Sequence, residues 1–203
     1  MQISYGITKD PQLLGEYYQV REHCYQQELQ LPSFDGSEEP ADRNGSIFVA
    51  KNNRQCLGGA RIVGGTKELA SQLLLVDLMA ELDLDPGACC IWERLAVSQA
   101  YRENISQPEF CGHLINTSRS LGYDYAFMVS SVRNARFYRL CHSALDIPFK
   151  IFHHVECIPS GPFAQLEHVL SVAYLREGFL DKITSETSHH FALSQQPYYG
   201  VAA

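Results

Sequence analysis

The chain has 203 residues, enough for one domain with a full hydrophobic core and too few for two comfortable ones. Hydrophobic residues make up 45% and charged residues 19%, as in a typical soluble globular protein, and no apolar run approaches the length of a membrane span. The formal net charge of -7 argues against nucleic acid as the main partner.

Seven cysteines without any C-x-x-C spacing argue against both a disulfide framework and a zinc site. The His pairs of the sequence have no Cys or carboxylate at ligand spacing, so we expect no metal. The opening stretch "MQISYGITKDPQLLGEYY" lacks the basic start and apolar core of a signal peptide. These features together predict a cytoplasmic protein with buried, reduced thiols.

The first half of the chain predicts a strand, a helix and a hairpin, followed by a second helix and a second strand. Residues 3–7 form a short strand, and apolar residues at helical spacing predict a helix from Pro11 to Gln30. The acidic, breaker-rich segment 31–45 is expected to be a loop. The remaining elements are a hairpin over 46–65 around an Asn-Asn turn, a helix over 67–84 and a strand over 87–98.

The second half predicts alternating helices and strands. In chain order these are a helix over 108–123, a strand over 124–131, a helix over 132–144 and strands over 149–158 and 167–177, the last of which also fits a helical period. Residues 181–203, rich in Ser, His and Gln, are expected to form a loosely ordered tail. The sequence therefore predicts a single α/β domain over residues 1–180 with a mixed, mostly antiparallel sheet flanked by helices.

This order of elements resembles the GNAT acyltransferase fold. The segment "WERLAVSQAYREN" is similar to the GNAT strand that ends in a "LaV…yR" pattern, and "NARFYRL" is similar to the "N…A…fY" helix of many such enzymes. The N-terminal half most resembles the acyl-homoserine-lactone synthases and the long-chain N-acyl amino acid synthases. That resemblance implies transfer of a fatty acyl group from acyl carrier protein to an amine.

Several site residues follow from this resemblance. The synthases carry an Arg and an aromatic residue in the first helix, matched here by Arg21 and Tyr25, and an Arg on the second hairpin strand, matched by Arg61. An acidic pair whose members lie three residues apart is matched here by Glu39 and Asp42. We expect these two carboxylates to form an ion-pair network with Arg94 on the central strand. The Trp that the synthases have six residues after the aromatic is Leu31 here, so the amino-acid N-acylating branch stands at least level with the lactone-forming branch.

Glu93 is the candidate general base. The synthases' catalytic carboxylate lies three residues before the Arg of their central strand, which Arg94 matches here. That position is held by Ile91, and Glu93 points to the same strand face two residues later. A carboxylate within an apolar strand is costly unless it is paired or useful, so the alternative is a structural ion pair with Arg61 or Arg21. Strand alternation places Arg94 on the opposite face, where we expect it to pair with Glu39 or Asp42.

Other candidates serve the substrates. Arg21 and Arg61 could grip an acceptor's carboxylate or belong to the ion-pair network. Tyr138 falls where many GNAT enzymes keep a Tyr that protonates the leaving thiolate, and it could equally be a core aromatic. Ser130 and Ser131 could bond the acyl carbonyl or simply end a strand.

The donor is suggested by two features. Acetyl-CoA enzymes of this fold cradle the pyrophosphate with a glycine-rich loop, whereas this chain continues with "SQAYRENISQPEFCG". Arg133, Arg136 and Arg139 lie three apart on one predicted helix, where they could dock an acidic carrier protein or be an ordinary solvated face.

We therefore expect an acyltransferase with no tightly bound cofactor, using acyl-phosphopantetheine on acyl carrier protein or acyl-CoA as donor substrate. Its partners would be acyl carrier protein and a small-molecule amine, either an amino acid or a compound of the S-adenosylmethionine type. An acetyl-CoA-dependent N-acetyltransferase and a degenerate, non-catalytic GNAT module remain the alternatives.

Overall fold

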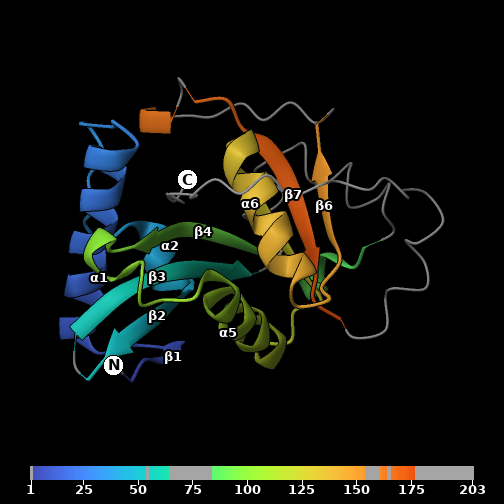
Figure 1. Cartoon of the computed structure of the whole chain (residues 1–203), viewed down its shortest axis with the longest axis horizontal. Coiled ribbons are helices and arrows are strands. Elements are labelled where there is room, and N and C mark those ends of the chain that lie inside the picture. Colours follow the sequence, from blue (N-terminus) through green and yellow to red (C-terminus); the bar gives the residue numbers. More distant parts are fainter. Residues whose placement is uncertain (1, 54, 65–83, 154–160, 164–165, 177–203) are drawn as a thin grey trace.

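The computed structural model describes residues 2–53, 55–64, 84–153, 161–163 and 166–176 (Figure 1). The helix expected over 67–84 and the tail expected over 181–203 therefore lie almost entirely or wholly outside the described residues. The proposed limits of the domain at 1–180 stay a prediction.

Seven strands form one sheet in the order β1-β2-β3-β4-β5-β7-β6. Only β4 and β5 run parallel, and all other neighbours are antiparallel, which confirms the predicted mixed, mostly antiparallel sheet. The strands are β1 (Ser4–Ile7), β2 (Ser46–Asn52), β3 (Gln55–Gly64), β4 (Cys89–Val97), β5 (Tyr125–Ser130), β6 (Phe149–Phe152) and β7 (Val169–Tyr174). The segment around residue 170, which fitted two periods, is thus a strand.

Three long helical segments lie where the sequence predicts them. The helix α1 (Pro11–His23) continues as one π-helical stretch (Cys24–Glu28), and α5 (Gln107–Ser120) and α6 (Val132–Ser143) follow later. The segment expected to be a loop before the hairpin holds a five-residue helix, α2 (Pro40–Asn44). Its start is fixed by a capping box, in which the side chain of Asp42 accepts from the main-chain N–H of Glu39 at 2.7 Å.

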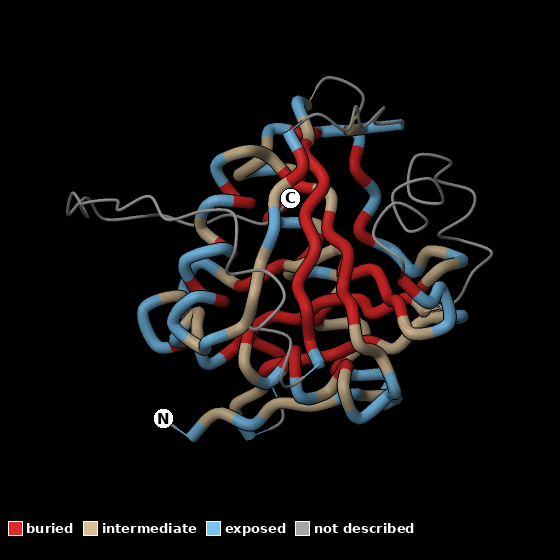
Figure 2. Tube along the Cα trace, turned by 90° about the vertical axis from the view of Figure 1, so that its right-hand side faces the viewer, coloured by how far each residue is buried: buried red, intermediate tan, exposed pale blue. Residues whose placement is uncertain are grey.

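The helices cover both faces of the sheet. On one face, Phe110 and Leu114 of α5 pack with Trp92 and Met128 of the strands in the largest core cluster. On the other face, Tyr17 and its neighbours in α1 pack on the residues of β2 and β3 whose side chains point away from α5. Figure 2 shows the result, in which the central strands are buried and the exposed residues lie at the turns and outer helical faces.

The two parallel strands separate partway along their length. Main-chain pairing of β4 with β5 ends at Ile91 and Phe127, although β4 continues to Val97 and β5 to Ser130. In Figure 1, β4 runs sideways while β7, the partner of β5, stands nearly upright. The second half of β4 therefore has one edge that no strand of the described chain covers.

Candidate active site

A β-bulge lies in β4 where the strand leaves its parallel partner. Gly59 pairs with Ala96 and Arg61 pairs with Glu93, so that the two residues Arg94 and Leu95 stand opposite Ala60 alone. Arg94 has φ 53°, in the left-handed region that non-glycine residues seldom adopt. Because the bulge interrupts the strict alternation of side chains, Glu93 and Arg94 do not diverge to opposite faces as expected. Both join one ion-pair network.

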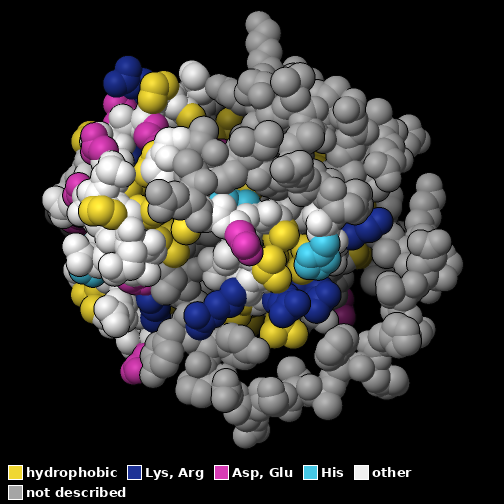
Figure 3. All heavy atoms as spheres, turned by 90° about the horizontal axis from the view of Figure 1, so that it is seen from above, with side chains coloured by type: hydrophobic (Ala, Val, Ile, Leu, Met, Phe, Trp, Pro, Cys, Tyr) yellow, Lys and Arg dark blue, Asp and Glu magenta, His cyan; other side chains and the backbone are white. Residues whose placement is uncertain are grey.

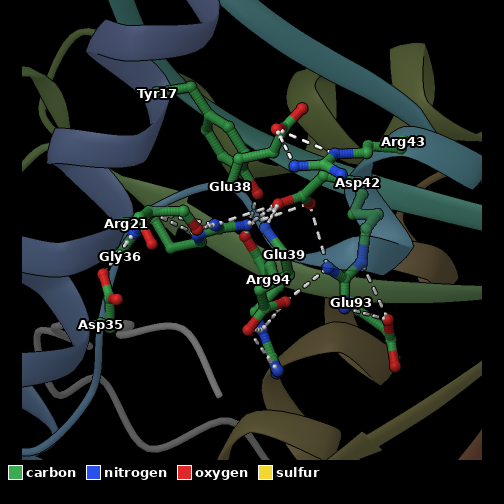
Figure 4. Close-up of polar contacts among 12 residues, drawn as sticks. Tyr17, Arg21, Asp35, Gly36, Glu38, Glu39, Asp42, Arg43, Glu93 and Arg94 are labelled. Atoms are coloured by element: carbon green, nitrogen blue, oxygen red, sulfur yellow. Dashed lines mark hydrogen bonds and ion pairs between the residues drawn. The ribbon is translucent and has the colours of Figure 1, made fainter.

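Arg61 is the centre of that network, and Figure 4 labels its partners Glu39, Asp42 and Glu93. Its Nη2 and Nε lie 2.6 and 3.0 Å from Oε2 of Glu93, the residue directly across the strand pair. Its Nη1 lies 2.5 Å from Oε2 of Glu39 and 3.0 Å from Oδ1 of Asp42. Glu93 is therefore paired with Arg61, one of its two expected partners, and not with Arg21.

Arg21 and Asp42 form a fully buried pair beneath the network. Both side chains have 0% exposure, and two nitrogens of Arg21 bond the carboxylate of Asp42 at 3.1 Å. Arg21 also donates to the main-chain carbonyls of Gly36 and Ser37, which satisfies the rest of its guanidinium. Neither Arg21 nor Arg61 is thus held ready for an acceptor's carboxylate, since each is already engaged by protein groups.

Arg94 completes the network at its more open side. Its Nη2 and Nε bond the two oxygens of Glu39 at 3.0 to 3.2 Å, and its guanidinium lies over the ring of Phe163 at 4.8 Å. Asp42, the other expected partner of Arg94, is instead shared by Arg21 and Arg61.

The network sets the ionisation of its members. Burial of Glu39 disfavours its charged form, but hydrogen bonds and charges from Arg94 and Arg61 outweigh burial and hold its pKa below the usual value. Burial would likewise lower the pKa of Arg61, and the carboxylates of Glu93 and Glu39 reverse this and raise it. Both groups are therefore fixed in their charged forms.

Glu93 keeps one oxygen available. Arg61 occupies Oε2 only, and no described residue donates a hydrogen bond to Oε1. The side chain is 25% exposed, at the stretch of β4 whose far edge is uncovered. A carboxylate held in this way can accept a proton from a group placed beside Oε1.

A small cavity of about 20 Å³ lies where the separating strands β4 and β5 meet the helices α5 and α6. It has room for about one water-sized group. Its lining residues come from β4, β5, α5 and α6 and are Trp92, Leu95, Cys111, Leu114, Met128, Val129, Ser130, Tyr138 and His142.

Ser130, predicted to bond the acyl carbonyl, and Tyr138, predicted to protonate the leaving thiolate, both line this cavity, whereas Ser131 does not. Ser131 caps α6, where its hydroxyl accepts from the N–H of Asn134 at 3.2 Å. Ser130 donates to the carbonyl of Ser131 at 3.3 Å. Burial raises the pKa of Tyr138, so its hydroxyl stays protonated and can act as a donor.

Tyr25 lies fully buried between the network and an aromatic cluster. Its ring stacks on Phe34 at 4.6 Å, and its hydroxyl has no hydrogen-bond partner among the described residues. Burial raises the pKa of Tyr25 against the opposing charge of Arg94, which lies nearby. The substrate-binding role expected for Tyr25 stays a prediction. Leu31, where the synthases have Trp, is buried in the same cluster.

The loop after β4 is held by Arg102. Its Nη2 bonds both carboxylate oxygens of Glu28 at 2.5 and 2.6 Å, and the guanidinium also donates to the carbonyl of Val97 at 3.0 and 3.1 Å. Residues 98–106 contain no glycine, and a 3-10 turn (Gln99–Tyr101) leads to the start of α5. The loop is therefore built around a charged side chain and is not a glycine-rich phosphate cradle.

Arg133, Arg136 and Arg139 are exposed along α6, and the role expected for them in docking a carrier protein stays a prediction. Figure 3, which views the molecule from above, shows Lys and Arg side chains close together with hydrophobic and His side chains between them.

Sequence reasoning missed two residues of this region. Tyr17 donates its hydroxyl to the carbonyl of Arg94, and His142 lines the cavity. A signal for His142 exists in the sequence, since Asn134, Tyr138 and His142 recur every four residues and are all buried on one side of α6.

The fold of this chain is similar to that of several solved structures. It matches FeeM, an N-acyl amino acid synthase from uncultured soil microbes, at TM-score 0.61 and 12% identity, over 87% of this chain and 92% of that one. It matches BjaI, a CoA-dependent acyl-homoserine lactone synthase, at 0.62 and 14%, over 85% and 80%. It matches a GNAT acetyltransferase from Staphylococcus aureus at 0.57 and 12%, over 86% and 100%.

The fold is thus that of the GNAT acyltransferases, which the resemblance in the sequence predicted. No protein-family model and no curated protein sequence matches the chain. None of the helices in the part of the chain that the structure describes has the length and apolar character to span a bilayer.

Proposed function

We propose that this protein is an N-acyltransferase that moves an acyl group from a phosphopantetheine thioester to a small amine. One observation carries the proposal. Glu93, with a free carboxylate oxygen, stands at the bulge where β4 leaves β5, and a small cavity lies between these two strands and the helices α5 and α6. A thioester laid along the edge of β4 that no described strand pairs with would have a proton acceptor near one end and a small cavity for its acyl group.

The described residues supply the parts of such a reaction. The attacking amine forms a bond to the thioester carbonyl and passes a proton to Oε1 of Glu93, directly or through a water. The tetrahedral intermediate then breaks its C–S bond, and Tyr138 protonates the departing thiolate. The products are an amide and a free thiol, and the proton on Glu93 returns to solvent and thence to Tyr138.

An acyl carrier protein is the donor that the surface favours. The three exposed arginines of α6 offer a basic face on a chain of net charge -7, and carrier proteins are acidic. The loop after β4 offers no glycine for a pyrophosphate to approach, and Arg102 is engaged by Glu28 and Val97. A donor that presents only a phosphopantetheine arm needs neither.

A second candidate is an N-acetyltransferase that uses acetyl-CoA. The cavity of about 20 Å³ favours it, because that volume suits a methyl-sized group and a fatty chain would enter only if lining side chains moved. The acceptor under the first proposal is an amino acid or a compound of the S-adenosylmethionine type, and Leu31 at the position of the synthases' Trp leaves both open.

The donor can be tested by charge reversal. We expect acyl carrier protein to be used with a higher kcat/KM than acyl-CoA, and its use to weaken as salt shortens the Debye length to about 8 Å and below. Replacing Arg133 and Arg136 with Glu should raise KM for the carrier protein and leave transfer from a short acyl-pantetheine nearly unchanged. A higher kcat/KM for acyl-CoA would refute the carrier-protein assignment.

The acceptor can be tested in a bacterium that expresses the protein. Mass spectrometry of the lipid extract should reveal new N-acyl amino acids, or lactones if the acceptor is of the S-adenosylmethionine type. A strain that expresses the Glu93→Gln variant is the control and should lack the new species.

A further inference from the structure

Arg94 has an unused hydrogen-bond donor at the bulge of β4. Its Nε and Nη2 bond the two carboxylate oxygens of Glu39 at 3.0 to 3.2 Å, whereas Nη1 has no hydrogen-bond partner among the described residues. The side chain is 21% exposed, and Nη1 is not one of the polar atoms that are both buried and without a partner. Nη1 therefore lies where a molecule from solution can reach it.

The guanidinium of Arg94 is held firmly in this position. Glu39 binds one edge of it, and the rings of Phe163 and Phe34 lie 4.8 and 5.7 Å from its Cζ atom. Burial acts to lower the pKa of Arg94, but Tyr25 and the hydrogen-bonded carboxylate of Glu39 outweigh burial and raise the pKa. The edge of Arg94 that carries Nη1 is therefore a charged donor in a fixed orientation.

Glu93, the preceding residue, offers the opposite charge. Arg61 occupies Oε2 of Glu93, and no described residue donates to Oε1. Within the network, only the guanidinium of Arg61 and the carboxylate of Glu39 separate Glu93 from Arg94, because Arg61 bonds Glu93 and Glu39, and Glu39 bonds Arg94. The bulge thus presents one free carboxylate oxygen and one free guanidinium nitrogen on an ion-pair network whose other described charges are paired.

An amino acid carries groups that match these two. Its amine can donate to Oε1 of Glu93, and its carboxylate can accept from Nη1 of Arg94 in a charge-assisted hydrogen bond, about twice as strong as a neutral one. Arg21 and Arg61 are less suited to this role, because protein carboxylates and carbonyls already occupy their guanidinium groups.

We propose that Arg94 binds the carboxylate of the acceptor while the amine of the acceptor lies at Oε1 of Glu93. The acceptor would then be an amine with a carboxylate on the same carbon atom, as in an amino acid or its S-adenosyl derivative. This inference names the acceptor class within the proposed function, on which it rests. Arg94 forms and breaks no covalent bond in the reaction and acts only by binding the carboxylate.

Matched acceptors test the role of the carboxylate. The amino acid that is acylated best should have a kcat/KM about ten- to a hundredfold above that of its primary amide, which keeps the amine and the side chain without the negative charge. Intrinsic reactivity would act the other way, because the amine of the amide is less basic and more of it is unprotonated.

The Arg94→Lys variant keeps a positive charge for Glu39 and loses the free edge of the guanidinium. It should raise KM for the amino acid about ten- to a hundredfold and leave KM for the amide nearly unchanged, because a contact remote from the forming bond is equal in ground and transition states. A purely structural role would lower kcat for both acceptors alike. Arg102→Lys is the matched control, since Arg102 is 16% exposed and pairs with Glu28 outside the network, and it should keep the full preference.

A binding measurement separates this inference from the proposed function. N-acetylglycine carries the carboxylate of the smallest possible product, and N-acetylglycinamide lacks it. In NMR titrations the acid should have a Kd about ten- to a hundredfold lower than the amide in the wild-type protein, and the two values should be nearly equal in Arg94→Lys. The wild-type comparison stands even if the variant fails to fold.

Three results would overturn the inference. They are equal Kd values for the two probes in the wild-type protein, equal kcat/KM for the amino acid and its amide, and a preference for the carboxylate that survives in Arg94→Lys. A protein that transfers no acyl group yet shows the Arg94-dependent difference in Kd would refute the proposed function alone.

Discussion

The phenolic hydroxyl of Tyr17 donates a hydrogen bond of 2.6 Å to the main-chain carbonyl of Arg94, which joins α1 to the bulge of β4. The ring of Tyr17 reaches this position by crossing Gly59, where an added Cβ would lie 2.9 to 3.0 Å from ring carbons. A glycine on β3 thus permits the close approach, and the hydrogen bond supports a left-handed Arg that would otherwise be strained.

Replacing Tyr17 with Phe should destabilise the fold by about 1–3 kcal/mol, because the partly buried carbonyl of Arg94 loses its donor. Urea denaturation measures the free energy of unfolding, and Tyr18→Phe is the matched control, since no hydrogen bond of the Tyr18 hydroxyl lies within the described structure. Equal stability of the two variants would show that the hydrogen bond does not support the bulge.

Replacing Glu93 with Gln should slow acyl transfer by about a hundredfold or more, as expected when a general base is lost. The fold should remain, because Arg61 keeps Glu39 and Asp42 as partners. Glu38→Gln alters a carboxylate paired with Arg43 at the surface and should leave turnover as it is. Near-wild-type turnover of the Glu93 variant would exclude the residue as the base.

The loss of stability in variants of the ion-pair network should increase with the burial of the ion pair that is broken. Asp42→Asn should cost about 3 kcal/mol or more, because it leaves the fully buried Arg21 without a counter-charge. Arg94→Ala should cost less, since Arg94 and Glu39 are 21% and 25% exposed, and Arg43→Ala at the surface should cost under about 0.5 kcal/mol. Melting temperatures and urea midpoints report the order, and equal values for Asp42→Asn and Arg43→Ala would contradict it.

Stability should fall in mild acid because of His142. Its pKa drops from 6.5 to about 4 on folding, so the unfolded state binds the proton more readily, and the stability present above pH 6.5 is lost as the pH falls toward 4. The loss at pH 5 should be about 2 kcal/mol relative to pH 7.5. Glu39, whose pKa is also depressed, adds a loss only at lower pH. The His142→Phe variant should show a flatter stability profile between pH 7.5 and 5, and an unchanged slope would show that another group titrates there.

The sequence predicted the elements well and the contacts of the site in part. Period-two and helical patterns located the described strands and long helices, since both follow from which side chains are buried. The members of the ion-pair network were also predicted, yet their pairing was partly wrong. The cause is the bulge at Arg94, because a left-handed residue is signalled in sequence by glycine and gives no signal when it is arginine.

The helix α2 was missed for a different reason. Five residues carry too little periodicity to stand out from a polar segment, and the capping pair Glu39 and Asp42 was interpreted only as ion-pair partners. The stacking of the His142 ring is a tertiary property, set by helix packing on Trp92 and Phe149, and no local pattern encodes it.

The network at the bulge contains three guanidinium groups and three carboxylates, those of Arg21, Arg61 and Arg94 and of Glu39, Asp42 and Glu93. Its charges cancel, so its potential decays much faster with distance than that of a single ion. An anionic acceptor therefore receives no electrostatic guidance toward Glu93 from this network and must be recognised by contacts made after it arrives. The rate of acceptor binding would then depend little on ionic strength, whereas the rate of donor docking on the arginines of α6 would depend on it. Salt would therefore slow the binding of one substrate and leave the binding of the other nearly unchanged.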